Sequence, residues 1–230
     1  MTGTDPDIGR QAKDIAEAAD TSVDAVKKLA SFLDGTFGNA ITNSIGILGD
    51  KLAYYRLTKA IELQEAVEQK LKERGVEKRY VPVAFGLPIV EKATVEEEPV
   101  LQEKWANLLT NARDATYDKP IRRNFTSMLA DMEPVDTQIF DLVVREYLAI
   151  AENREKSLFS REKLSQNTGI PGNVVENAVR NLIRLGLLKP GVVTGGISMG
   201  EHPVSSYKDT ELFGVTGLGL DFYYAVNDGK

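Results

Sequence analysis

The sequence predicts a mainly α-helical protein, and three observations support this fold class. Apolar residues recur three or four positions apart over most of the first 75 residues. The only tryptophan, Trp105, lies in a segment whose apolar residues share one helical face. After residue 157 the pattern changes to two short helices followed by glycine-rich, strand-like sequence. We therefore expect long N-terminal helices, a central helical bundle and a smaller C-terminal module with a β-hairpin.

The N-terminal region, residues 1–75, is expected to contain two long helices. Apolar residues at helical spacing run from residue 8 to residue 33, and a second stripe runs from about residue 40 to residue 73. Gly35 and Gly38 mark a break or a close contact after the first helix, and Arg74-Gly75 gives a stop with a basic last turn. Long amphipathic helices need a partner surface, so we expect a helical hairpin or a homo-oligomer.

Residues 31–50 allow a second interpretation. Gly38, Thr42 and Gly46 recur every four positions, as small residues do where helices pack closely in membranes. Asp34 and Asp50 interrupt the run, which favours a tightly packed contact in a soluble protein. A membrane-perturbing role is therefore an alternative, and liposome flotation would test it. The N-terminus has no secretory pattern and the chain has no cysteine, so we expect a cytoplasmic location.

The central region, residues 76–156, should begin with an extended segment over residues 76–88, because this segment contains two prolines and a glycine. The Trp105 helix follows, and its start is signalled either by Thr94 with Glu97 or by Pro99. We expect its apolar face to be buried and its polar residues to lie off that face. The apolar residues are Leu101, Trp105, Leu108, Leu109 and Ala112, and the polar ones are Gln102, Glu103, Lys104 and Asn111.

Two more helices are predicted in this region. One should start at Pro120, and the next should start over residues 133–136, where Pro134 precedes Asp136. The charged residues 151–156 are expected to join the central region to the third part of the chain, residues 157–230. Asn107 and Asn111 are expected to bond buried backbone within the bundle.

The C-terminal module has a characteristic order of signals. Ser160 can cap a short helix, residues 168–171 form a turn, and a second helix ends at Gly186. A strand, a glycine-rich hairpin and a final helix or strand complete the chain. A helix-turn-helix followed by a β-wing resembles a winged helix domain.

DNA binding through this module is an alternative that the sequence disfavours. The second helix offers four residues that could contact DNA, but Glu176 lies among them, and the module has seven basic and seven acidic residues. Neutralisation of phosphates dominates DNA affinity, and this module supplies little of it. We therefore favour a structural or protein-binding use. The four candidates are Asn177, Arg180, Asn181 and Arg184.

No catalytic or metal-binding constellation is evident. His202 is the only histidine and lies in the predicted wing, so any site built on histidine would have to include it. An acidic cluster could hold Mg²⁺, but electrostatic complementarity to a helix start explains it without a metal. We expect no cofactor, no metal and no enzymatic activity. The cluster comprises Glu91, Glu96, Glu97, Glu98 and Glu103.

The central region contains LPIVEKATVEEEPVLQEKWANLLTNA, followed by a helix start in MLADMEPVDTQIFDLV. On this motif, residues 52–150 resemble the bacterial Abi-alpha (abortive infection alpha) family. Met132-Glu133 departs from the leucine and small polar residue usual there. The matching positions are Glu91, Glu97, Glu98, Leu101, Trp105, Ala106, Asn107, Leu108, Leu109, Pro134 and Asp136.

The resemblance implies a role in defence against phage, in which infected cells stop growing or die. Together with the lack of catalytic residues, it predicts a non-enzymatic protein that contacts an unidentified phage or host protein. The expected form is a homo-oligomer. Nucleic acid and membrane are the disfavoured partners.

Overall fold

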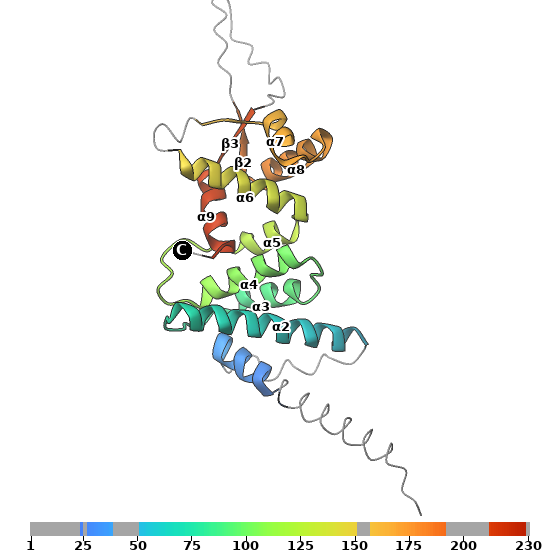
Figure 1. The fold of residues 1–230 in the computed structure, drawn as a ribbon. Helices are drawn as coiled ribbons and strands as arrows, with labels where there is room; N and C mark the ends of the chain where they lie inside the picture. Colours follow the sequence, from blue (N-terminus) through green and yellow to red (C-terminus); the bar gives the residue numbers. More distant parts are fainter. Residues whose placement is uncertain (1–23, 25–26, 39–50, 151–156, 192–211, 229–230) are drawn as a thin grey trace, which may run out of the picture. The chain divides into compact units, whose positions relative to one another are not determined.

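A computed structural model describes residues 24, 27–38, 51–150, 157–191 and 212–228 of the 230-residue chain (Figure 1). The described part is mainly helical and contains a three-stranded antiparallel sheet. The chain divides into two compact units, residues 1–96 with 109–117, and residues 97–108 with 118–230. The three-part division predicted from the sequence stays a prediction. Predictions for residues 1–23, 39–50, 151–156 and 192–211 lie outside the described residues.

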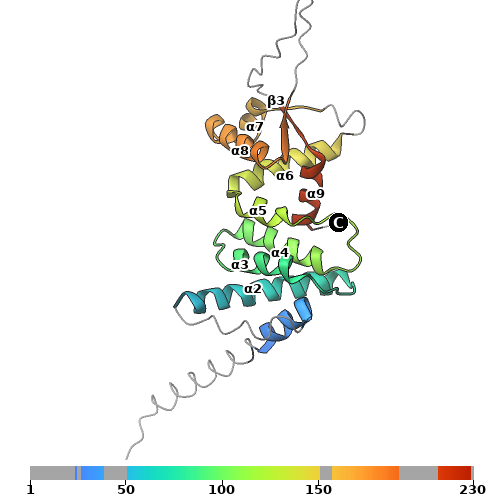
Figure 2. The ribbon, with the colours of Figure 1, turned by 180° about the vertical axis from the view of Figure 1, so that it is seen from behind.

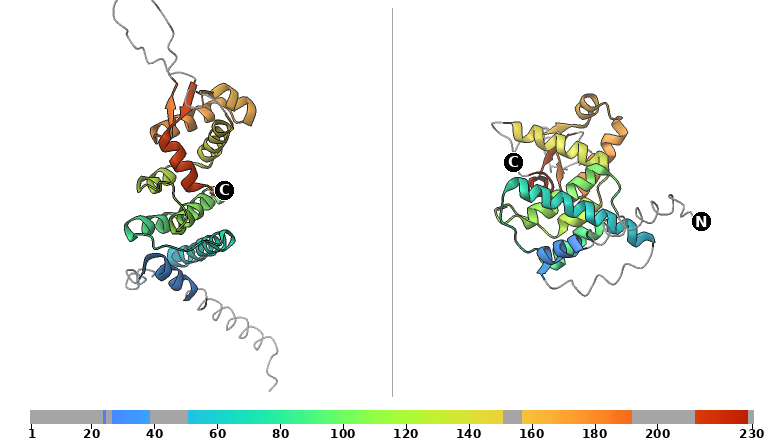
Figure 3. Two further views of the ribbon diagram at one scale, coloured as in Figure 1. Left: turned by 90° about the vertical axis from the view of Figure 1, so that its left-hand side faces the viewer. Right: turned by 60° about the horizontal axis from the view of Figure 1, so that its bottom comes forward.

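The first unit contains a helix over residues 27–37, α2 (Lys51–Arg74) and α3 (Val83–Ala93), and the first of these lies beside α2 (Figure 3). Gly38 follows the first helix at φ +69°, whereas Gly35 is helical, so the expected break occurs only at Gly38. The predicted stop at Arg74-Gly75 is confirmed. Gly75 takes φ 63° and its N–H donates to the carbonyls of Leu71 and Lys72.

The prediction of an extended segment over residues 76–88 is wrong for its second half. Residues 76–82 belong to no helix and form one isolated bridge, at Lys78, and Val81 N–H donates to the Thr36 carbonyl. Helix α3, however, begins at Val83 and includes Pro88. The buried residues of α3 explain the difference, because Gly86, Ile89 and Ala93 share a helical face. Alternating apolar residues misled the sequence-based interpretation, since that pattern coexists here with a helical one.

Helix α4 (Pro99–Arg113) carries Trp105 and begins at Pro99, the second of the two predicted starts. Thr94 instead ends α3, where its hydroxyl donates to the Glu91 carbonyl. Every residue from 104 to 114 is buried. The expectation that Lys104 and Asn111 lie off the buried face is therefore wrong. Lys104 meets Asp141 and Asn227, and Asn111 meets Arg74.

The second unit continues with α5 (Asn124–Ala130) and α6 (Pro134–Ala149). The predicted start at Pro120 is wrong because residues 120–123 are irregular. Lys119 lies over the ring of Tyr224, and Arg122 pairs with Asp221, so contacts to a distant helix accompany the irregular conformation. The predicted start of α6 is confirmed. Pro134 stands in its first turn, and the Asp136 carboxylate accepts from the N–H of Glu133 at 2.8 Å.

The remaining elements of this unit are β1 (Phe159–Ser160), α7 (Arg161–Thr168), α8 (Gly172–Arg184), β2 (Leu188–Pro190), β3 (Leu212–Val215) and α9 (Gly217–Val226). Ser160 caps α7 as predicted, and Gly169 at φ 71° ends it. The strands form an antiparallel sheet in the order β1-β3-β2. The sequence indicated the strand at β2 but gave no signal for the two-residue β1.

Aromatic residues form much of the core of the second unit. The Phe222 ring of α9 lies 5.4 Å from Phe125 in an edge-to-face contact and 5.9 Å from Phe140, measured between centroids. All three rings are at most 1% exposed. Helix α9 therefore packs against both α5 and α6, and it lies beside them in Figure 1 and Figure 2. Among the described helices, none combines the length and apolar character that a bilayer span requires.

We expect Gly219→Ala to lower the free energy of unfolding by about 1–3 kcal/mol through overpacking. A Cβ at Gly219 would lie 2.2 Å from the carbonyl oxygen of Leu187, which belongs to the backbone and cannot rotate away. Gly217→Ala is the matched control, because a Cβ there meets no atom within 4 Å. Urea denaturation of both variants tests this, and equal unfolding midpoints would contradict the close approach of α9 to residue 187.

Candidate functional site

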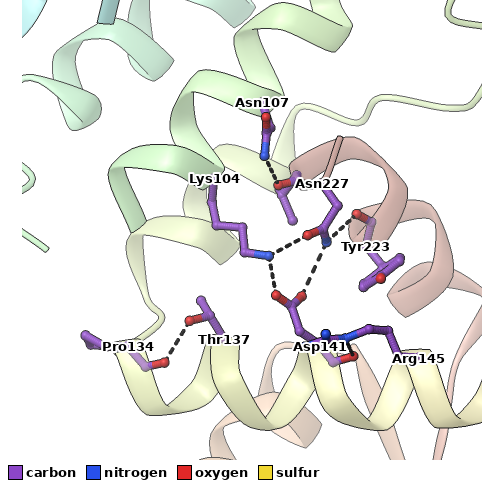
Figure 4. Close-up of polar contacts among 9 residues, drawn as sticks. Lys104, Asn107, Pro134, Thr137, Asp141, Arg145, Tyr223 and Asn227 are labelled. Carbon is purple, nitrogen blue, oxygen red and sulfur yellow. Dashed lines mark hydrogen bonds and ion pairs between the residues drawn. The ribbon is translucent and has the colours of Figure 1, made fainter. Parts of the chain in front are cut away.

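The side chain of Lys104 is the centre of a buried polar cluster in the second unit (Figure 4). Its Nζ donates to Asp141 Oδ2 of α6 at 2.5 Å and to Asn227 Oδ1 at 2.6 Å. Asn227 caps the C-terminus of α9. The side chains of Lys104 and Asp141 are only 7% and 18% exposed. A buried ammonium thus joins α4, α6 and the end of α9.

Two amides complete this cluster, which comprises Lys104, Asn107, Asp141 and Asn227 and is here called the Lys104 cluster. Asn227 Nδ2 donates to Asp141 Oδ1 at 3.3 Å and to the Tyr223 carbonyl at 2.9 Å. Asn107 Nδ2 donates to the Val226 carbonyl at 3.2 Å, which confirms the expected backbone bond of that residue. The cluster thus donates hydrogen bonds to the carbonyls of Tyr223 and Val226 at the end of α9, where helix carbonyls lack partners within the helix.

The nearby phenol of Tyr223 is affected by the same carboxylate. Burial, followed by the negative charge of Asp141, raises the pKa of Tyr223 above its ordinary value. This shift favours the protonated, neutral form of the phenol. Since Lys104 is already held by two acceptors, the Lys104 cluster is arranged to hold helices together.

A second charged cluster lies in the first unit, around Arg113 at the end of α4. Arg113 Nη1 donates to Glu68 Oε1 of α2 at 2.6 Å, and the guanidinium lies 4.8 Å from the centroid of the Phe32 ring. Lys78 pairs with the other oxygen of Glu68. The Arg113 side chain is 2% exposed, and the carboxylate that pairs with it is shared with Lys78.

Asp114, next along the chain, is held by a separate set of donors. Its Oδ2 accepts from Arg74 Nη1 at 3.1 Å, and its Oδ1 accepts from the backbone N–H and the hydroxyl of Thr116 at 2.8 and 2.6 Å. Arg74 also donates to Asn111 Oδ1 at 2.8 Å. Asn111 was expected to bond to backbone, whereas its side-chain oxygen accepts from the side chain of Arg74.

These contacts lower the pKa of both carboxyl groups. Burial alone would raise the pKa of Glu68, but hydrogen bonds and charges from Lys78 and Arg113 outweigh it. Burial would likewise raise the pKa of Asp114, and the hydrogen bonds from Thr116 and Arg74 hold it below its ordinary value. Both carboxylates therefore stabilise the folded chain more in the ionised form than in the protonated form.

We expect the free energy of unfolding to fall in acid, with Glu68 and Asp114 contributing to the loss. Their folded pKa values lie below the unfolded ones, so their stabilisation is complete above about pH 5 and is lost as the pH falls through the folded values. Urea denaturation between about pH 2 and pH 7 measures this. The double variant Glu68→Gln, Asp114→Asn should show a shallower decline than the parent protein. An identical slope would contradict the assignment.

The apolar residues of the predicted Trp105 motif are buried together on α4. Trp105 is 1% exposed, Leu101 is 3% exposed, and Leu108 and Leu109 are fully enclosed. Asn107 belongs to the Lys104 cluster. In contrast, the three acidic motif residues Glu91, Glu97 and Glu98 are exposed. The motif is therefore mainly a packing motif.

Three of the four residues predicted to contact DNA bond instead to acceptors within the protein. Asn181 Nδ2 donates to the Asp131 carbonyl at 3.0 Å and to Asp136 Oδ2 at 2.7 Å. Arg184 pairs with Asp131 at 3.2 Å, and Arg180 pairs with Glu176 at 2.7 Å. Asn177 is exposed on the same helix. The helix face thus presents basic groups that neighbouring carboxylates neutralise.

No group of three or more His, Asp or Glu side chains is placed to hold a metal ion in the part of the chain that the structure describes. His202 lies outside that part.

Comparison with known protein families gives a match over most of the chain. The model of the family described as "Abortive infection alpha" matches residues 56–226, from α2 to the last residue of α9. The chain belongs to the abortive infection alpha family. Searches of curated proteins and of solved structures gave no match.

The match confirms the predicted family and extends beyond the residues that carried the resemblance. Those residues ended at 150, whereas the abortive infection alpha region also includes α7, α8, the sheet and α9. Sequence reasoning missed Asp141 and Asn227, which hold Lys104 in this abortive infection alpha chain. The only signal was a lysine directly before the tryptophan of an apolar helical face, and that signal does not identify its partners.

Proposed function

We propose that this chain is a non-enzymatic antiphage defence protein that acts through contacts with another protein. Membership of the abortive infection alpha family carries the defence part of the proposal. The name of that family describes an outcome for the infected cell, and it specifies no reaction.

The arrangement of charged residues supports the non-enzymatic part. Lys104 and Arg113 are both nearly enclosed, and each is held by a carboxylate of its own unit. A general acid or base must reach a substrate proton, directly or through one water. Groups held in this way are suited to stabilising a scaffold, and a scaffold exerts its effect through its surface.

The defence activity can be tested by phage challenge. Bacteria that express the chain should show a lower efficiency of plating than bacteria with an empty vector. At high multiplicity of infection the culture should stop growing before phage are released. Normal plating with a panel of unrelated phages, with the protein present in soluble form, would contradict the proposal.

The mode of action needs a separate measurement. We expect light scattering to give a mass above that of one 25.3 kDa chain. We also expect affinity capture from infected cells to recover a protein that capture from uninfected cells does not. A defence phenotype that persists without such a partner, together with turnover of a small molecule by the purified chain, would favour an enzyme instead.

A second candidate is a winged helix that binds DNA. The order α7, turn, α8, β2, β3 supports it, because a helix-turn-helix followed by an antiparallel strand pair is the arrangement of winged helix domains. Asn177 and Arg180 are exposed on α8. The ion pairs of Arg180 and Arg184 with carboxylates weigh against it, since those carboxylates would repel phosphates.

Duplex DNA titrations at several salt concentrations distinguish the two candidates. A DNA-binding regulator should bind with a steep dependence on salt, and Arg180→Gln should weaken it. Lys163→Gln is the control, because Lys163 is exposed on α7 of the same module. The protein-binding proposal predicts weak binding that both variants reduce equally.

A further inference from the structure

A hollow in the first unit collects positive charge. It has a volume of about 400 Å³ and lies between the helix of residues 27–37, α2 and the Arg113 end of α4. This volume is within the range of small-molecule sites, about 300–1,000 Å³. Three cationic side chains and one carboxylate are among its lining residues: Lys28, Lys78, Arg113 and Glu68.

The carboxylate in this wall is already engaged. Glu68 Oε1 accepts from Arg113, and Glu68 Oε2 accepts from Lys78, so the one negative charge of the hollow is shared between two cations. Three positive charges against one negative charge leave the hollow with a net formal charge of +2. The whole chain has a net charge of −6, so this surface has the opposite sign to the protein as a whole.

The donors in the hollow differ in mobility. Arg113 is fixed against Phe32 and is almost fully enclosed, and its Nε has no hydrogen-bond partner among the described residues. Lys28 and Ser31 are exposed on one helix, and Gln64 lies on the facing wall. A buried guanidinium thus provides a fixed positive field, while an ammonium, a hydroxyl and an amide are available at the opening.

We propose that this hollow binds the phosphate group of a small anionic ligand. A phosphate dianion matches the net charge of +2 and offers several acceptor oxygens to the lysines, the hydroxyl and the amide. Lysine ammonium groups bind phosphate as compact point charges, which suits a hollow whose guanidinium is already paired. The proposal goes beyond the proposed defence function and does not depend on it.

The test is a titration of the full chain with inorganic phosphate by isothermal calorimetry. Ionic strength is held constant with chloride, at a pH high enough that inorganic phosphate is mainly the dianion. We expect saturable binding that chloride does not reproduce. Lys28→Glu should weaken it about tenfold, because it replaces an attractive charge with a repulsive one. The absence of saturable binding would overturn the proposal.

The matched control is Lys27→Glu on the same helix. The side chain of Lys27 is 72% exposed, pairs only at 3.8 Å with Asp24, and does not line the hollow. It should change the affinity by less than about twofold at physiological salt, because exposed charges away from the site are screened. Equal losses in both variants would show general electrostatics and would overturn the site. If charge reversal at Lys28 lowers the melting temperature, Lys28→Gln replaces it in the test. This variant removes the charge without reversing it, and we expect an intermediate loss of phosphate affinity.

Two further probes identify the source of the phosphate. Glycerol phosphate represents a soluble ester, and phosphatidylcholine vesicles with and without phosphatidate represent a lipid headgroup. Binding of either probe that is lost in Lys28→Glu and kept in Lys27→Glu supports the site and names its source. If both variants retain phosphate binding in full, the phosphate binds at another place on the protein and the proposal is overturned.

Discussion

We expect Trp105→Ala to lower the free energy of unfolding by about 3–5 kcal/mol. The indole is 1% exposed, and Leu101 and Leu108 beside it on α4 are buried as well, so truncation leaves a cavity inside a close-packed core. This is a large part of the stability of an ordinary domain, about 5–15 kcal/mol. Urea denaturation followed by circular dichroism measures it, with a large fall in melting temperature as a second readout.

Two control variants separate the loss of volume from other effects. Trp105→Phe should cost clearly less than Trp105→Ala, because most of the apolar volume remains and the indole Nε1 has no hydrogen bond to lose among the described residues. Tyr80→Ala should change stability by no more than about 0.5 kcal/mol, since Tyr80 is 71% exposed. An unchanged melting temperature for Trp105→Ala would place the indole outside the core and would require a new account of α4.

Lys104→Met is expected to have an effect of similar size, about 3–5 kcal/mol, for an electrostatic reason. Methionine keeps much of the aliphatic stem but removes the ammonium. Asp141 then remains largely buried beside an apolar side chain, and Asn227 Oδ1 loses its donor at 2.6 Å. Removing one partner of a buried pair is costly because the remaining charge has neither water nor a counterion.

A double-mutant cycle shows whether the loss comes from the unpaired carboxylate. The double variant Lys104→Met, Asp141→Leu should be more stable than Lys104→Met alone, because it leaves no uncompensated charge. Lys163→Met is the matched control at an exposed lysine of the same unit, where we expect almost no change. Additive losses in the cycle would mean that Lys104 stabilises the fold through packing of its stem alone.

Local signals predicted the elements whose ends are decided by neighbouring residues. The stop at Gly75, the cap at Ser160 and the start of α6 at Pro134 all depend on groups within a few positions. The same reasoning failed at residues 83–88, where an alternating pattern and a helical pattern overlap. It also failed at Pro120, because a proline permits a helix start but does not require one.

The candidate site was predicted only in part. The Trp105 motif was correctly assigned to the core, since a tryptophan among leucines at helical spacing is best explained by burial. Lys104 and Asn111 were assigned to the polar side, because one amphipathic stripe suggests one buried face. The structure encloses both of them, and this is possible only because other charged or amide side chains meet them.

The helical class, the family and most of the helix ends follow from local sequence, because each depends on short-range spacing or on a contiguous motif. Which charges are buried, and which groups compensate them, depends on how the chain packs. Lys104 bonds to Asn227, 123 positions along the chain, and Arg113 bonds to Glu68, 45 positions away. No local pattern encodes such pairs. They are fixed when distant helices exclude water and leave each buried charge with a single available partner or set of partners.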